Sequence, residues 1–140
     1  MGDAREDVLA ANQAFYDAFE SLELARMQGV WLRAPHICCV HPGWGLLVGW
    51  GPIMESWERI FAGALGMRVT LTGGEVEVRG DVAWVVVREN IESHHRDGKM
   101  VGVVQATNLF ERRDGRWWLV HHHGSPVYPP FVGDPSERVH

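Results

Sequence analysis

Three short turn signals in the second half of the chain constrain its fold most. The pairs Gly80-Asp81, Asp97-Gly98 and Asp114-Gly115 have the composition of two-residue hairpin turns. They separate four segments rich in Val, Thr and aromatic residues, at 67–79, 82–95, 100–112 and 117–123. This spacing predicts a four-stranded antiparallel meander.

The first half of the chain has helical periodicity instead. Apolar residues recur every three or four positions from Asp3 to Met27, which predicts one long amphipathic helix. Shorter helical segments are expected at 30–34 and 52–64, with short strands at 37–40 and 44–48. Helices followed by a meander indicate the α+β class.

Length, charge and cysteine content exclude several classes of protein. The 140 residues fit one domain, expected over 1–126, with a Pro-rich tail at 127–140. Lys and Arg number 13 against 18 Asp and Glu, and no basic run could follow a nucleic acid backbone. No segment is apolar enough to span a membrane, and the N-terminus lacks the layout of a signal peptide. The adjacent Cys38 and Cys39 are read as small apolar residues in a reducing compartment, so a cytoplasmic location is expected.

Counting outward from the hairpin turns assigns side chains to the two faces of the meander. The count pairs Asn108 with His121, and pairs Ala106 with both His123 and Glu89. One face is then mostly apolar and should lie under the helices. Glu89, Asn108, His121 and His123 fall on this face, where polar groups must be paired, hydrated or functional.

The opposite face is expected to hold a mixture of polar and large apolar side chains. It includes Trp84, Val86, Leu109, Trp118, Val120 and His122. This mixture is too apolar for open water, which predicts a homodimer through the outer sheet face.

The order of these elements resembles the nuclear transport factor 2-like superfamily. The hairpin with Glu111-Arg112-Arg113-Asp114-Gly115-Arg116-Trp117 and Val120-His121-His122-His123-Gly124-Ser125-Pro126 is similar to that of its SnoaL-like branch and of the calcium/calmodulin-dependent kinase association domain. The segment Cys39-Val40-His41-Pro42-Gly43-Trp44, followed by Gly49 and Ser56-Trp57, is similar to bacterial members of that branch. The resemblance implies a conical roll, with a long N-terminal helix and two shorter helices packed on a curved, mostly antiparallel sheet that encloses a pocket.

The superfamily includes isomerases, cyclases, dehydratases, hydrolases and non-catalytic assembly domains. The kinase association domain resembles this chain in its hairpins but has arginines where this chain has Glu89 and Asn108, so ligand charge preference should differ. Ketosteroid isomerase relatives combine a pocket Asp with a Tyr, whereas the two tyrosines here, Tyr16 and Tyr128, lie outside the meander. Their chemistry is therefore not carried over.

Two hypotheses for the polar residues of the inner face stay open. Glu89 with His121 or His123 could transfer a proton, while Asn108 or His123 donates to a carbonyl oxygen. The same residues could instead form a structural polar network. His121, His123 and Glu89 could also be read as a metal site, but the resemblance implies none, and neither a metal nor a cofactor is expected.

The resemblance places His41 at the rim of the pocket, where it would shape, with Trp44, the entrance for a flat or apolar ligand. The alternative is that His41 satisfies a loop carbonyl. Candidate ligand contacts of lower rank are Trp57, Trp31, Phe15 and Tyr16, with a place in the core as the alternative. The resulting hypothesis is a pocket for a small, partly apolar organic molecule, with cofactor-independent isomerase, cyclase or dehydratase chemistry if it is an enzyme. The alternative is a non-enzymatic ligand-binding or assembly module.

Overall fold

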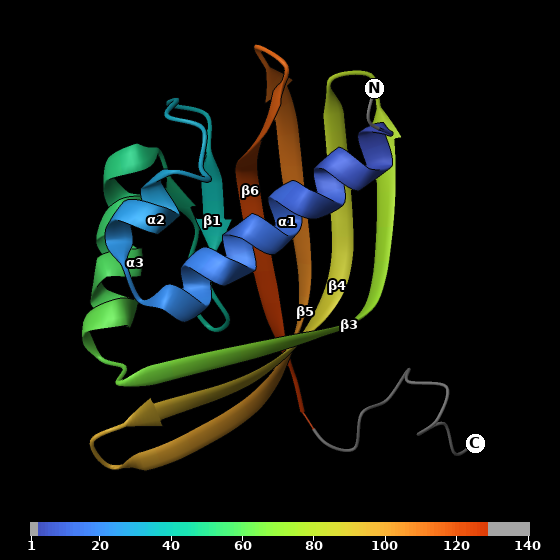
Figure 1. Ribbon diagram of the computed structural model, residues 1–140. Coiled ribbons are helices and arrows are strands. Elements are labelled where there is room, and N and C mark those ends of the chain that lie inside the picture. Colours follow the sequence, from blue (N-terminus) through green and yellow to red (C-terminus); the bar gives the residue numbers. More distant parts are fainter. Residues whose placement is uncertain (1–2, 129–140) are drawn as a thin grey trace.

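The protein forms an α+β roll, which confirms the predicted class. The computed structural model describes residues 3–128 (Figure 1). Within that range it contains helices α1 (Ala4–Ser21), α2 (Leu24–Gln28) and α3 (Trp50–Ala62), and strands β1 (Cys38–Val40), β2 (Leu47–Val48), β3 (Gly66–Arg79), β4 (Val82–His95), β5 (Gly98–Arg113) and β6 (Arg116–Val127). The predicted Pro-rich tail lies, beyond Tyr128, outside the described residues.

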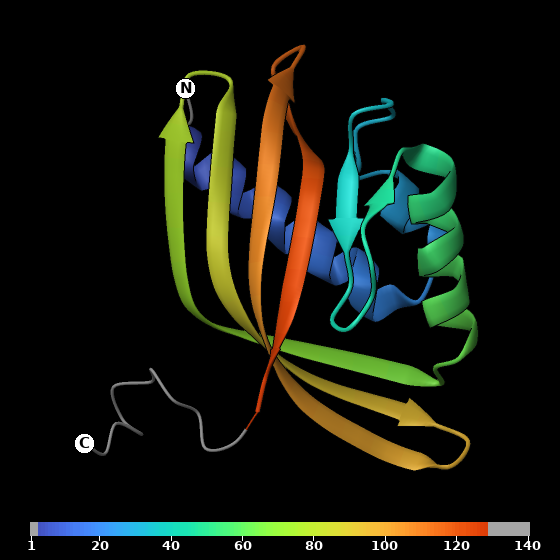
Figure 2. The ribbon, with the colours of Figure 1, turned by 180° about the vertical axis from the view of Figure 1, so that it is seen from behind.

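The six strands form one sheet in the order β2-β1-β6-β5-β4-β3. Strands β1 and β6 are parallel, and the other neighbours are antiparallel. Helix α1 crosses one face of the sheet, which we call the inner face, while α2 and α3 lie to the side, next to β1 and β2 (Figure 1). Figure 2 shows the opposite side, the outer face, where none of the described helices packs.

The sheet bends along its length, and a bulge in β3 contributes to the bend. The register between β3 and β4 shifts between Thr72 and Glu75, where β3 has one more residue than β4. Gly73 lies in this shift with a φ of 62°, a conformation that glycine adopts without steric strain. In both views the lower ends of β3, β4 and β5 swing toward the side on which α3 lies, so the sheet curves around the helices (Figures 1 and 2).

The N-terminal helix is shorter than the periodicity predicts. Asp3 caps α1 by accepting a hydrogen bond from the Arg5 amide at 3.1 Å. The helix ends at Ser21 because Leu22 adopts a left-handed backbone with φ of 58°, and α2 begins only at Leu24. The prediction of one helix from Asp3 to Met27 is therefore wrong in its continuity, although both helices bury apolar residues in the same core. The helical segment expected at 30–34 is also wrong, because Trp31 forms a β-bridge with Leu119 there.

Two of the three hairpin counts hold at their turns, and the middle one is displaced by two residues. The turn at Gly80-Asp81 pairs Val78 with Ala83, as expected. In the middle hairpin His95 pairs with Gly98, so Glu89 lies opposite Val104 rather than Ala106. Because side chains alternate with a period of two, this displacement leaves Glu89 on the inner face.

The last hairpin contains the error that matters for the site. Arg113 pairs with Arg116 and Phe110 with Leu119, as expected, but the register then shifts and Leu109 pairs with His121. The backbone of Leu119 exchanges hydrogen bonds with Val30 and Leu32 on its other side, and β1 takes over that side from His121 onward. Val120 is thus an extra residue at the place where β6 changes neighbours, and every later side chain of β6 faces opposite to the prediction.

No helix among residues 3–128 combines the length and the apolar character that a membrane crossing requires.

Candidate functional site

The inner face holds a continuous chain of hydrogen bonds that ends on Glu89. His122 Nδ1 lies 2.6 Å from Asn108 Oδ1, and Asn108 Nδ2 donates to Asn12 Oδ1 at 2.8 Å and to the Tyr16 hydroxyl at 3.0 Å. The Tyr16 hydroxyl donates to Glu89 Oε2 at 2.5 Å. Since the amide oxygen of Asn108 can only accept, His122 must carry its proton on Nδ1. Donors therefore run in one direction, and the carboxylate of Glu89 is the terminal acceptor.

The members of this hydrogen-bonded chain come from one helix and three strands, and all are deeply buried. Asn12 and Tyr16 lie one turn apart on α1, and Glu89, Asn108 and His122 lie on β4, β5 and β6. Glu89 is 1% exposed, Asn108 0% and His122 1%. The hydrogen bond from Tyr16 occupies Oε2 of Glu89, which leaves Oε1 as the oxygen that can take a proton.

Burial sets the protonation of these groups. It raises the pKa of Glu89 to about 7, against the opposing effect of the Tyr16 hydrogen bond. Burial and the nearby Glu89 charge raise the pKa of Tyr16 well above its usual range, so the phenol remains a donor. Burial lowers the pKa of His122 to about 3, so its imidazole is neutral at pH 7. Glu89 is thus the member of the network whose charge changes near neutral pH.

A second polar cluster lies next to the first, around His41. Ser56 donates to the Ile53 carbonyl at 2.6 Å, so its oxygen accepts from His41 Nε2 at 2.8 Å. Cys39 Sγ is 3.6 Å from the same nitrogen. Burial raises the pKa of the Cys39 thiol and lowers the pKa of His41 to about 4, so this is a neutral thiol beside a neutral imidazole. Such a pair lacks the thiolate that nucleophilic catalysis requires.

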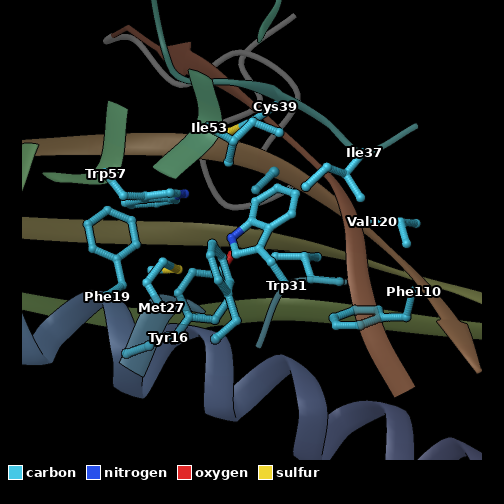
Figure 3. Close-up of a cluster of buried hydrophobic side chains, with 14 of the residues drawn as sticks. Tyr16, Phe19, Met27, Trp31, Ile37, Cys39, Ile53, Trp57, Phe110 and Val120 are labelled. Carbon is cyan, nitrogen blue, oxygen red and sulfur yellow. The ribbon is translucent and has the colours of Figure 1, made fainter. Parts of the chain in front are cut away.

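Aromatic rings link the two clusters. The ring of Trp57 lies edge-on to His41, with centroids 4.7 Å apart, and 6.1 Å from His122. Phe15 packs against Trp57 at 5.7 Å and His122 at 4.9 Å. Trp31, Trp57 and Phe15 are each 0% exposed. These three residues lie in the core, which is the alternative that the sequence left open. Figure 3 shows Trp31 and Trp57 there.

The structure brings together some of the expected site residues and separates others. Glu89, Asn108 and Tyr16 lie in one network. His121 and His123 do not join it: the extra residue in β6 turns them to the outer face, where their rings lie 6.0 Å apart. The expectation that they share a face with Glu89 is therefore wrong. His41 is buried rather than at an open rim, whereas Trp44, 4.9 Å from it, is 37% exposed.

Sequence reasoning missed His122, Asn12 and Ser56. Asn12 had a usable signal, because it interrupts the apolar stripe of α1 formed by Val8, Phe15 and Phe19. The two consecutive apolar residues Leu119 and Val120 were the only sign of the bulge that turns His122 inward. Ser56 appeared only in the Ser56-Trp57 pair of the family resemblance, which gave it no role in a site.

The arrangement offers little to a metal ion. Within residues 3–128 no group of three His, Cys, Asp or Glu side chains has the geometry of a metal site. The set of Glu89, His121 and His123 that the sequence raised is split between the two faces of the sheet.

Two cavities bear on access to the interior. One of about 120 Å³ lies between α3 and the β1–β2 segment and is lined by Trp44 and Ser56, among others, so it reaches the His41 cluster from outside. A larger one of about 760 Å³ is lined chiefly by outer-face residues of the bent strands, such as Thr70, Asn90 and Val103, and not by the Glu89 network. In this state the network is closed to solvent.

Known proteins match nearly the whole chain. The model of the SnoaL-like domain matches residues 8–129. A candidate dehydratase of the NTF2-like family from Streptomyces avermitilis has a solved structure with 36% identity and a TM-score of 0.84, covering 89% of this chain and 96% of that one. A candidate calcium/calmodulin-dependent protein kinase type II association domain from Thiobacillus denitrificans has 30% identity and a TM-score of 0.76, covering 85% and 94%.

A plant relative matches as well. The F-box protein SKIP8 of Arabidopsis thaliana is 28% identical over 133 residues, which is 95% of this chain. The chain spans about half of that protein, 54% of its length.

Proposed function

The chain belongs to the SnoaL-like domain family of NTF2-like proteins, and from this premise we propose that its interior binds a small, partly apolar organic ligand and transfers a proton with Glu89 as the base. The observation that carries the proposal is the directed donor chain that ends on the buried Glu89 carboxylate. The candidate dehydratase, at 36% identity, supports chemistry of the same class. A cytoplasmic setting is part of the proposal, since Cys38 and Cys39 are both free thiols.

The proposed step is the removal of a proton from the carbon next to a carbonyl. Glu89 Oε1 takes the proton, the C–H electron pair forms a C=C bond, and the carbonyl π electrons move onto its oxygen. Returning the proton at another carbon isomerises the ligand, attack on a second carbonyl closes a ring, and loss of a β-hydroxyl as water dehydrates it. These outcomes need no cofactor. Tyr16 holds the other oxygen of Glu89, and a pKa near 7 keeps the base matched to neutral pH.

Access in this proposal runs through the smaller cavity, beside Trp44 and Ser56. Trp44 is the partly exposed member of the His41–Trp44 pair, and His41 contacts Trp57 behind it. His41 and Trp44 then shape the entrance, and Trp57 with Phe15 forms the apolar wall between the entrance and the Glu89 network.

Proton transfer is tested most simply without knowing the natural substrate. The wild-type protein in D₂O at pH 7.5 is mixed with acetophenone, 2-tetralone or cyclohex-3-enone, and deuterium uptake at the α-carbon is followed by NMR. We expect uptake from at least one ketone well above the buffer rate, because enolisation is common to the reaction types proposed. No uptake above buffer from any of the three would reject Glu89 as a catalytic base for such compounds.

A second candidate function, an assembly module, is favoured by the outer face. Trp84 and Leu109 lie in one cross-strand row of that face, and Val86 lies in the next row. All three side chains are half-buried, although no described helix packs on this face. We propose that a second copy of the chain covers this face, which would serve either function.

The dimer is expected to depend on Trp84. Sedimentation of the wild-type protein should show a dimer, and Trp84→Glu should sediment as a folded monomer because it buries a charge in the apolar row. Trp44→Glu, at an exposed tryptophan on the β1–β2 segment, is the matched control and should stay dimeric. A wild-type monomer at tens of micromolar would contradict the assembly proposal.

A further inference from the structure

Two buried indole groups in the core lack hydrogen-bond partners. Trp31 and Trp57 are both 0% exposed, and within the described residues neither Nε1 has an acceptor. A buried N–H donor without an acceptor costs about 1–3 kcal/mol, so such groups call for an explanation. In Figure 3 the nitrogen edges of Trp57 and Trp31 are turned toward one another across the interior. Two unused donors therefore face one region.

Most donors of the neighbouring polar groups are already engaged in hydrogen bonds. Both amide protons of Asn108 are engaged, one with Asn12 and one with Tyr16. The Tyr16 proton is held by Glu89, and the His41 Nε2 proton by Ser56. Among the described side chains, the two indole N–H groups are the fully buried donors without an acceptor.

The surroundings also select the charge of what the indoles could bind. The buried polar side chains of the described residues are Asn12, His41, Ser56, Glu89, Ser93, Asn108 and His122, with no Lys or Arg among them. An anionic ligand would meet the Glu89 carboxylate and no compensating cation, which is unfavourable in an apolar interior. A carbonyl oxygen, in contrast, has two lone pairs and can accept from two donors at once.

We propose that the indole N–H groups of Trp31 and Trp57 together bind the carbonyl oxygen of a neutral, largely apolar ligand. This inference rests on the proposed function, since it names the ligand class of that same interior. Neither indole nitrogen is in contact with solvent, so the ligand enters by moving a wall of the core. That wall is α3, which carries Trp57 and Ser56 and borders the cavity beside Trp44.

The test follows the indole protons of the wild-type protein by ¹H–¹⁵N NMR. Phe variants of Trp31 and Trp57 assign the two resonances and are used only if they unfold cooperatively. The protein is titrated with acetophenone, with ethylbenzene, which has a similar shape but no acceptor, and with benzoate, which carries a charge. We expect acetophenone to shift both indole protons downfield and to bind about 10-fold more tightly than ethylbenzene, as two neutral hydrogen bonds would allow. Benzoate should bind more weakly than acetophenone.

Several results would overturn the inference. One is that acetophenone leaves both indole proton resonances unmoved or fails to bind at millimolar concentration. Another is that ethylbenzene shifts both resonances as far as acetophenone does. Cross-peaks from both indole protons to an internal water in the free protein would show that water fills the role. In the assigned Trp57→Phe protein, affinity for acetophenone should fall about 5-fold while that for ethylbenzene holds. An equal loss of affinity for acetophenone and ethylbenzene would show that Trp57 contributes to binding through packing and not through a hydrogen bond.

Failure of this inference and failure of the proposed function give different results. Deuterium uptake by acetophenone without movement of the indole protons rejects the indole site and keeps the base. Movement of both indole protons with no uptake from any ketone keeps the indole site and rejects proton transfer.

Discussion

Glu89→Gln protein will lose ketone deuteration by at least about 100-fold relative to wild type while keeping its fold. Glutamine has nearly the shape of glutamate and can still accept the Tyr16 hydrogen bond, but it cannot take a proton from carbon. The measurement is the rate of deuterium uptake at pH 7.5. Glu92→Gln is the matched control: Glu92 lies on the same strand but on the outer face, and its replacement should leave the rate unchanged.

The same variant should gain stability relative to wild type as the pH rises. The folded pKa of Glu89, about 7, exceeds the unfolded value of 4.5, so between these values the folded protein binds more protons and its stability falls with rising pH. Glutamine does not titrate and lacks this loss, which amounts to about 3 kcal/mol. The difference in unfolding free energy between Glu89→Gln and wild type should therefore shift by about this amount in favour of the variant from pH 4 to pH 8. A difference that is constant with pH, or an unchanged exchange rate, would contradict the role given to Glu89.

His122→Asn protein will resist acid better than wild type. The folded pKa of His122 is about 3 and the unfolded value 6.5, so above pH 6.5 the protein has the full stability of this neutral, buried group, and loses it as the pH falls toward 3. Between pH 6.5 and pH 3 the free energy of unfolding falls by as much as about 5 kcal/mol because of His122. Asparagine keeps an N–H near the position of Nδ1, facing Asn108, but does not titrate.

The measurement is urea unfolding from pH 4 to pH 7. The wild-type unfolding free energy should fall below pH 6.5, because His122 and His41, with a pKa of about 4, together outweigh the opposite pH dependence of Glu89. In His122→Asn the contributions of His41 and Glu89 oppose each other, so the slope should be clearly smaller. His123→Asn, exposed on the same strand, should follow the wild type. Equal slopes in wild type and His122→Asn would show that His122 is not buried in its neutral form.

Short-range patterns were enough to predict most of the fold. The turns at Gly80-Asp81 and Asp114-Gly115 set their own hairpins, because a two-residue turn determines the pairing of its flanking residues. Even the displaced middle hairpin kept Glu89 inside, since an error of two residues preserves the face. Apolar periodicity did not predict where the first helix ends: the spacing extended it to Met27, but the left-handed backbone of Leu22 ends it at Ser21.

The composition of the site depended on contacts that spacing does not encode. Val120 is an extra residue in β6 because the strand changes its neighbour there. This change of neighbour brings His122 to the inner face in place of His121 and His123. The contact between Tyr16 and Glu89 joins residues 73 positions apart, on a helix and a strand whose relative placement depends on the whole core. Sequence reasoning therefore found Glu89 and Asn108 on the inner face, but not what they bond to.

The most direct test of the proposed base is the titration of Glu89 itself. Its side-chain carboxyl ¹³C resonance, assigned through Glu89→Gln, can be followed from pH 4 to pH 9 in the wild-type protein. We predict a pKa of about 7, rising further in Tyr16→Phe, because the Tyr16 hydroxyl stabilises the charged form. A resonance that titrates near 4.5 and ignores the Tyr16→Phe change would contradict a buried base held at the end of a chain of donors.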